Sequence, residues 1–163
     1  FKGSWTLHTL RWMMGEEKFW NAVRRLIYDT PDPWSLSYPI TPTQRSSEDF
    51  ITIASDEYGE DLRWFFDAYL FSKDIPTLKV DRSNNELRLS FRDLPSLILD
   101  IPVVLYEDSA LKGDKHNVSR STTLSIRSDG SSHAVPSSAR IQIDPEVKIF
   151  REFSTAQRCQ ISQ

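Results

Sequence analysis

The chain has 163 residues, of which 39% are hydrophobic and 26% are charged, a composition typical of a globular protein with a buried core. A formal net charge of −3 and scattered basic residues argue against a nucleic-acid-binding surface. No apolar run approaches the ~18 residues that cross a bilayer, so the sequence predicts no membrane span in this segment.

The first part of the chain predicts helices. A helix over residues 6–14 is expected to end at Gly15, because glycine favours a helix C-terminus. A second helix starts at Glu16, where a carboxylate favours the helix dipole, and it stops before Pro31 and Pro33. The residues predicted to face the core are Leu7, Leu10 and Met14 in the first helix, and Phe19, Trp20, Val23, Leu26 and Ile27 in the second.

Two further helices follow a proline-rich surface loop over residues 31–45. Ser46 or Ser47 is expected to cap the third helix, and Gly59 to end it. Asp61 is expected to open the fourth helix. These helices are too aromatic on one side to be stable alone, so they need partners. The predicted core residues are Phe50, Ile53 and Ala54 in the third helix, and Leu62, Phe65, Phe66, Tyr69 and Leu70 in the fourth.

From Pro76 onward the apolar period changes to two residues, which predicts β-strands. Asn84 and Asn85 indicate a tight hairpin between the first two strands. Residues 108–121 and 128–138 are polar and are expected to form loops. Five or six short strands of this kind predict a small antiparallel β-sandwich. The strands are expected at residues 78–80, 87–91, 101–105, 124–126 and 141–143.

The predicted fold class is therefore α+β. An N-terminal helical subdomain of about four helices occupies residues 1–74, and the β-sandwich occupies residues 75–153. Residues 154–163 form a polar tail. The boundary is placed between Phe71 and Thr77, where the period changes.

Residues 1–11 resemble part of a motif of the gluzincin zinc aminopeptidases, the alanyl-aminopeptidase and leukotriene-hydrolase family. The family pattern reads Tyr-x-Lys-Gly-(Ala/Ser)-x-x-Leu-x-x-Leu, and Lys2 and Gly3 match its Lys-Gly pair. The tyrosine of that pattern would stand one residue before Phe1, so the chain is expected to start just downstream of the chemistry. In the family this tyrosine stabilises the oxyanion formed when zinc-bound water attacks the peptide carbonyl.

The resemblance extends over nearly all of residues 1–151. Residues 72–75 depart from it by lacking the family's usual glycine before Pro76, and Tyr69 stands where the family has tryptophan. The order and spacing of the matching segments together carry the resemblance. These segments are Gly-Glu-Glu-Lys-Phe-Trp at 15–20, Asp-Phe at 49–50, Gly-Glu-Asp-Leu and Phe-Phe-Asp within 59–67, Pro-Thr-Leu-Lys-Val at 76–80, Ile-Pro-Val at 101–103 and Ile-Asp-Pro-Glu at 143–146.

The resemblance implies that the parent protein is a zinc-dependent metallo-aminopeptidase that removes N-terminal residues from peptides. This chain would be a fragment of it that holds the last helices of the thermolysin-like catalytic domain and the following β-sandwich. The fragment would lack the zinc-binding motif and the catalytic tyrosine, and would support the active-site cleft. Its expected partners are the rest of the catalytic domain and, for the parent, the peptide substrate. The alternative is a non-enzymatic interaction module from a pseudo-peptidase.

No catalytic, substrate-binding or metal-ligating residue is expected in this chain, and no cofactor, whereas zinc is expected in the parent. The family's zinc motif, His-Glu-x-x-His, is absent, because His8, His116 and His133 are not spaced four apart. His8 is expected to pack or hydrogen-bond within a helix, and the other two to lie in solvated loops. Lys2 and Gly3 are adjacent to the active site by the motif. They would position the missing tyrosine, or Gly3 would let the backbone approach a neighbouring helix closely.

The remaining polar and aromatic clusters have structural interpretations. Carboxylates at residues 48–49, 57 and 60–61 could form an acid–base pair or a cation site, but helix capping explains them at lower cost. Asp108, Asp114 and Asp129 do not follow the spacing of a calcium loop. The tryptophans Trp5, Trp12, Trp20, Trp34 and Trp64 could stack a ligand, but packing in the core or between subdomains is favoured, because four of the five fall within predicted helices. We also expect self-association through an exposed helical face that includes Trp5, Trp12, Met13 and Phe65.

Overall fold

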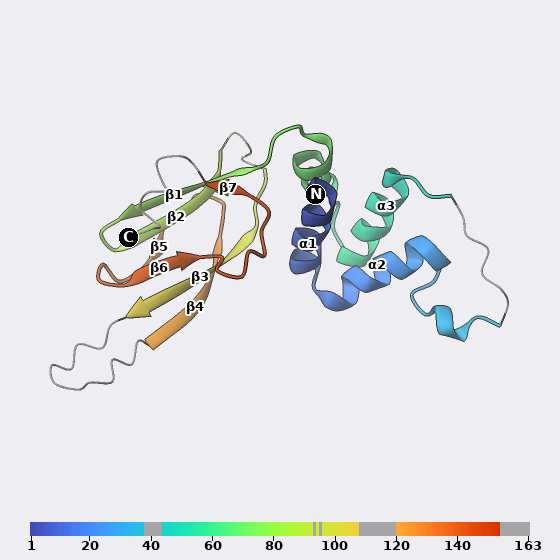
Figure 1. Cartoon of the computed structure of the whole chain (residues 1–163), viewed down its shortest axis with the longest axis horizontal. Coiled ribbons are helices and arrows are strands. Elements are labelled where there is room, and N and C mark those ends of the chain that lie inside the picture. Colours follow the sequence, from blue (N-terminus) through green and yellow to red (C-terminus); the bar gives the residue numbers. More distant parts are fainter. Residues whose placement is uncertain (38–43, 93, 95, 108–119, 154–163) are drawn as a thin grey trace. The chain divides into compact units, whose positions relative to one another are not determined.

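The computed structural model describes residues 1–37, 44–92, 94, 96–107 and 120–153. The chain divides into two compact units, Phe1–Asp74 and Ile75–Gln163. The helices of the described part lie in the first unit, and its strands lie in the second (Figure 1). Helices followed by two small sheets confirm the predicted α+β class.

The helical unit contains four α-helices and two short turns of other helical types in its described part. Gly15 ends α1, and its N–H donates to the carbonyl of Arg11. Gly59 ends α3 with a positive φ of 96°, which glycine adopts without strain. Both stop signals are therefore confirmed. The elements are α1 (Lys2–Met14), α2 (Glu16–Tyr28), the 3₁₀ turn η1 (Pro33–Ser35), α3 (Ser47–Tyr58), α4 (Arg63–Phe66) and the π-helical turn η2 (Asp67–Phe71).

The predicted cap of α3 is present at Ser46. Its hydroxyl accepts a hydrogen bond from the Asp49 N–H (3.2 Å), and the Asp49 carboxylate accepts one from the Ser46 N–H (2.7 Å). This reciprocal arrangement satisfies two amide donors that the first turn would otherwise leave without partners.

The buried faces of the helices differ in part from the predicted stripes. Leu7, Trp20 and Ile27 were predicted to face the core but are exposed. In α2 the buried face is centred on Phe19 and Ala22, and Ala22 was not in the predicted stripe because it is small. The fully buried large side chains in the described part of this unit are Leu10, Leu62, Phe65, Phe66 and Tyr69.

The end of the fourth helical segment is wider than an α-helix. The Ser72 N–H donates to the carbonyl of Asp67 (3.0 Å), five residues earlier, so η2 is a π-helical turn. Each residue in such a turn rotates less about the axis than in an α-helix. This explains why Leu70, which α-helical spacing placed in the core, is exposed.

The second unit contains two sheets. One has four strands in the order β5-β2-β1-β7, and the other has three in the order β4-β3-β6 (Figure 1). The strand pairs are antiparallel except β1 with β7, which is parallel. The strands are β1 (Thr77–Ser83), β2 (Glu86–Phe91), β3 (Asp100–Glu107), β4 (Arg120–Arg127), β5 (His133–Ala134), β6 (Arg140–Ile143) and β7 (Glu152–Phe153).

All five predicted strands are present, and the hairpin at Asn84 joins β1 to β2 with Ser83 opposite Glu86. Two predictions on loops are wrong. Ser121 lies in β4, and the loop expected over residues 128–138 contains β5. Residues 108–119 and the predicted tail at 154–163 lie outside the described residues.

A buried ion pair follows β6. The Asp144 and Arg151 side chains are 0% and 5% exposed, and the carboxylate accepts from Arg151 Nη1 at 2.6 Å. The same carboxylate accepts from the backbone N–H groups of Lys148 (2.7 Å) and Ile149 (2.9 Å). Arg151 also donates to the carbonyls of Ile149 and Ile143. The pair therefore holds the turn after β6 against the segment that leads to β7.

Candidate functional site

Lys2, the residue that the family motif places next to the active site, lies in the first turn of α1. Its Nζ donates to the carbonyl oxygens of Ser72 (2.5 Å) and Asp74 (3.2 Å). These carbonyls directly follow η2, where the negative end of a helix dipole favours a cation. Thr6 Oγ1 donates to the carbonyl of Lys2 (3.0 Å), which braces the same turn. Lys2 thus ties the start of α1 to the last residues of the helical unit.

Gly3, the second residue of the motif, has an open environment. A Cβ built at Gly3 would meet no atom within 4 Å among the described residues. Its position on α1 is ordinary helix, without a positive φ. The prediction that Gly3 permits close approach of a neighbouring helix therefore has no support in the described part of the chain. Of the two motif residues, Lys2 is the one whose side chain binds another segment of the helical unit.

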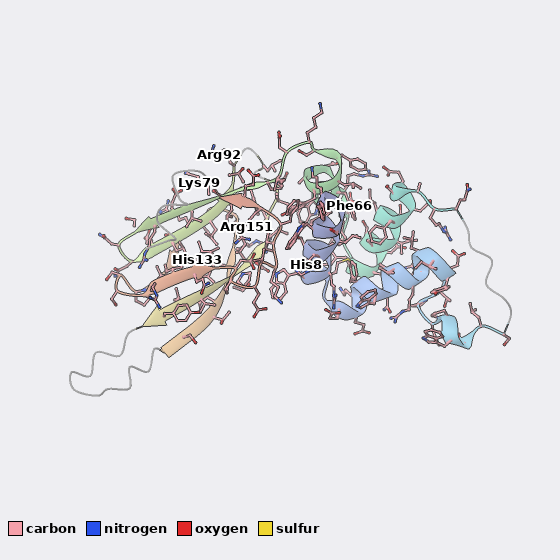
Figure 2. The ribbon with its side chains drawn as sticks, viewed as in Figure 1. His8, Phe66, Lys79, Arg92, His133 and Arg151 are labelled. Carbon is pink, nitrogen blue, oxygen red and sulfur yellow. The ribbon has the colours of Figure 1, made fainter. Side chains whose placement is uncertain are left out.

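The histidines of the described residues do not form a metal site. His8 lies on α1 and His133 on β5, in different units of the chain (Figure 2). No group of three or more histidine, cysteine or acidic side chains that could hold a metal ion occurs in the described ranges. The described residues therefore do not fit a zinc ion. His116 and Cys159 lie outside the described residues.

The two described histidines have neighbouring side chains. His8 is exposed on α1, and its ring contacts that of Trp5 edge-on, with 5.6 Å between ring centroids. His133 was predicted in a solvated loop, but it is half-buried in β5, and its Nε2 lies 3.2 Å from Ser131 Oγ. The prediction for His133 is wrong because a two-residue strand is too short to give a periodic pattern.

Most carboxylates of the predicted acidic clusters have structural partners: Glu48 and Glu57 accept hydrogen bonds from arginines, and Asp49 and Asp61 accept them from backbone N–H groups. Arg63 donates to Glu48, and this hydrogen bond lowers the pKa of the Glu48 carboxyl. The Ser46 N–H lowers the pKa of Asp49 in the same way. A group held ionised by such partners is poorly suited to general acid catalysis near neutral pH. The structural interpretation of these residues is therefore favoured.

Arg25 was not singled out in the sequence, although it joins two helices. From α2 it donates to Glu57 (2.7 Å) and Asp56 (3.2 Å), both on α3. The hydrogen bond with Glu57 raises the pKa of Arg25. The only available signal was an arginine on one predicted helix and an acidic pair on another, which does not specify a contact.

Four of the tryptophans, Trp5, Trp12, Trp20 and Trp34, are exposed, the last of them by 86%, so none of the four lies in the core of the helical unit. For Trp5 and Trp12 this agrees with the predicted exposed helical face. Trp20 takes part in a polar cluster, donating to Glu16 (3.0 Å). The Arg11 guanidinium lies 5.4 Å from the centre of the Trp20 ring. Phe65 was predicted both in the core of the fourth helix and at the exposed helical face, and it is fully buried, so the core prediction is confirmed and the exposed position is wrong.

None of the described helices is long and apolar enough to cross a bilayer. No family model matches the chain, and no curated protein sequence does. Among solved structures, the chain is similar to Legionella pneumophila aminopeptidase A in complex with aspartic acid. The TM-score is 0.62 at 17% sequence identity, and the similarity covers 94% of this chain and 17% of that chain. The chain thus has the fold of a segment of an aminopeptidase and spans about a sixth of that protein's length.

Proposed function

We propose that the chain is a segment of a zinc-dependent metallo-aminopeptidase of the gluzincin family, and that its role is to support the active-site cleft. The observation that carries this proposal is the similarity of fold over 94% of the chain to a segment of an aminopeptidase. The motifs that resemble the family occur in the family's order from Lys2 to residues 143–146. They support the proposal independently, because they are features of the sequence and do not depend on the fold.

In this proposal the helical unit is the C-terminal part of the catalytic domain, and the two-sheet unit is the β-sandwich domain that follows it. Zinc and the residues that bind it belong to the part of the parent outside this segment. Zinc would activate the attacking water there. The contribution of this chain is positional. Lys2 fixes the first turn of α1 to the carbonyls of Ser72 and Asp74, and so holds the end of α1 that the family's tyrosine precedes.

The test has two parts. The reading frame of the parent should encode His-Glu-x-x-His upstream of this segment, and the purified parent should hydrolyse alanyl or leucyl reporter substrates in a zinc-dependent manner. This chain alone should bind no catalytic zinc and cleave neither reporter. A parent that lacks the motif and the activity, but keeps the fold, would contradict the proposal and favour a non-enzymatic interaction module.

A positional role for Lys2 makes a separate prediction for the parent. Replacing Lys2 by methionine should lower kcat more than it raises KM, because substrate contacts stay while the oxyanion-stabilising group is displaced. Lys2→Arg keeps the charge and should restore part of kcat. If both variants lose the same activity, and a lower yield of folded enzyme accounts for the whole loss, then the role of Lys2 is purely structural.

A further inference from the structure

A single chain crossing joins the two units. The helical unit ends at Asp74, and the two-sheet unit begins at Ile75. Domains of one chain usually move relative to each other, and a few residues at their junction absorb the change in backbone torsions. We call residues 74–76 the hinge. How freely the hinge can turn depends on the contacts that hold these three residues.

On the helical side of the hinge, the backbone is held by a turn at Ser72 and by the side chain of Lys2. The Asp74 N–H donates to Ser72 Oγ (3.2 Å), which closes the turn. Lys2 Nζ donates to the carbonyls of Ser72 (2.5 Å) and Asp74 (3.2 Å), which lie on either side of Lys73. The Asp74 carbonyl belongs to the planar peptide group that leads to Ile75, so the contact with Lys2 restrains the torsion ψ of Asp74.

On the sheet side, the backbone is held by a proline ring and by strand pairing. The ring of Pro76 fixes its own φ, and it confines ψ of the preceding residue, Ile75, to extended values. The Pro76 carbonyl accepts a hydrogen bond from the N–H of Glu152 (2.9 Å), the first residue of β7. Within the hinge, φ of Ile75 is therefore the torsion that these contacts leave unrestrained, and a β-branched residue strongly disfavours its positive values.

We propose that Lys2 restrains the hinge and so keeps the two units from reorienting freely. With Lys2 bound, φ of Ile75 is the torsion that can change without breaking one of these contacts of the hinge. With Lys2 removed, ψ of Asp74 can change as well, and two adjacent free torsions allow a wide range of orientations. Because Lys2 is a charged donor, its hydrogen bonds are stronger than those between neutral groups. One side chain of α1 thus decides how freely the two-sheet unit moves.

The contact with Asp74 distinguishes this role from the capping of a helix end. A lysine that only capped η2 would be satisfied by Ser72, which directly follows that turn. Lys2 also reaches the carbonyl of Asp74, which is the last residue of the helical unit and belongs to the hinge. Lys18 shows the simpler arrangement, since its Nζ donates to the carbonyl of Tyr58 (2.9 Å), the last residue of α3. Lys18 is therefore a matched control.

The test is NMR relaxation of the backbone amides of the full chain, measured on the monomer, which gives the rotational tumbling time of each unit. In the unmodified chain the two units should share one tumbling time. Lys2→Met should separate the two values and shorten both by up to about twofold, because each unit holds about half of the residues. Lys2→Arg keeps the charged donor and should keep the common value. Lys18→Met removes a lysine–carbonyl contact away from the hinge and should also keep it.

Order parameters of the amides at Lys73, Asp74 and Ile75 supply a second readout. In the unmodified chain they should be about 0.85, as in rigid backbone, and in Lys2→Met they should fall below about 0.6. If circular dichroism shows that Lys2→Met does not fold, Lys2→Gln, which is neutral and too short for both carbonyls, takes its place with the same expectation. The proposal is overturned if the units of the unmodified chain tumble separately, or if the folded Lys2 variant keeps a common tumbling time. It is also overturned if Lys18→Met separates the units as the Lys2 variant does.

Discussion

Replacing Arg151 by methionine should selectively destabilise the two-sheet unit. The substitution removes the cation from a carboxylate that is fully buried, while Asp144 keeps its two backbone donors at 2.7 and 2.9 Å. Removing one partner of a buried ion pair typically costs about 3–5 kcal/mol. The two remaining hydrogen bonds still stabilise the carboxylate, so we expect a loss near the lower end, about 3 kcal/mol.

The distribution of tryptophan makes this loss measurable unit by unit. The five tryptophans, at positions 5, 12, 20, 34 and 64, all lie in the helical unit Phe1–Asp74. Tryptophan fluorescence in a guanidinium titration therefore reports unfolding of that unit alone. Far-UV circular dichroism reports both units. Arg151→Met should shift the strand-dependent part of the dichroism transition and leave the fluorescence transition in place.

Two further variants calibrate the result. Lys148→Met removes a cation of the same segment whose partner, Glu146, is on the surface, so stability should change little. Asp144→Ala combined with Arg151→Met should cost less than the sum of the single variants, because no unpaired charge remains buried. A loss below about 1 kcal/mol for Arg151→Met would refute the reasoning from the buried pair. An equal shift of the fluorescence transition would refute independent unfolding of the units.

Three other predictions concern the helical unit. Lys2→Met should lower the free energy of unfolding of the helical unit, measured by tryptophan fluorescence, by about 1–2 kcal/mol, because it removes a cation from two carbonyls at the end of η2. Lys2→Arg should lower it less. Ser46→Ala should cost about 1 kcal/mol through loss of the α3 cap, which thermal unfolding followed by fluorescence would measure, and an unchanged midpoint would contradict the capping role. Arg63 lowers the pKa of Glu48, and the Ser46 N–H and then the Ser46 hydroxyl lower the pKa of Asp49. The stabilisation from these two carboxylates is therefore present above their ordinary values of 4.5 and 3.8 and is lost as pH falls through the lower folded values. Ser46→Ala removes the hydroxyl's hydrogen bond and keeps that of the backbone N–H. The stability of the helical unit, measured as a function of pH, should therefore decline below about pH 4. In Ser46→Ala the decline should start at a higher pH and be smaller, and an identical pH profile in the two proteins would argue against this linkage.

The positions of the main elements could be predicted because they depend on local signals. Gly15, Ser46 and Gly59 act through the backbone of their own turns, so helix ends follow from sequence. The five strands with alternating apolar residues were likewise predicted, since one side of each faces a core. The two-residue strands β5 and β7 carry no periodic signal, and their formation depends on partners distant in sequence.

The faces of the helices and the candidate site were harder to predict. Trp20 has the hydrophobicity of a core residue, but its indole N–H is satisfied by Glu16 at the surface. Pattern analysis counts large apolar residues and overlooks Ala22, which is fully buried. The partners of Lys2 are backbone carbonyls seventy residues away, and every residue has such a group, so sequence contains no signal for this contact.

The π-helical turn of η2 has a consequence for variation in chain length. A π turn is equivalent to one extra residue accommodated within an α-helix, held here by the bond from Ser72 to Asp67. Deleting one residue between these two would restore α-helical spacing instead of breaking the helix. Among the helices of this unit, η2 is therefore the place where related sequences should differ by a single-residue gap. Such a gap would rotate every side chain that follows it up to Ser72, and with it the carbonyl that receives Lys2.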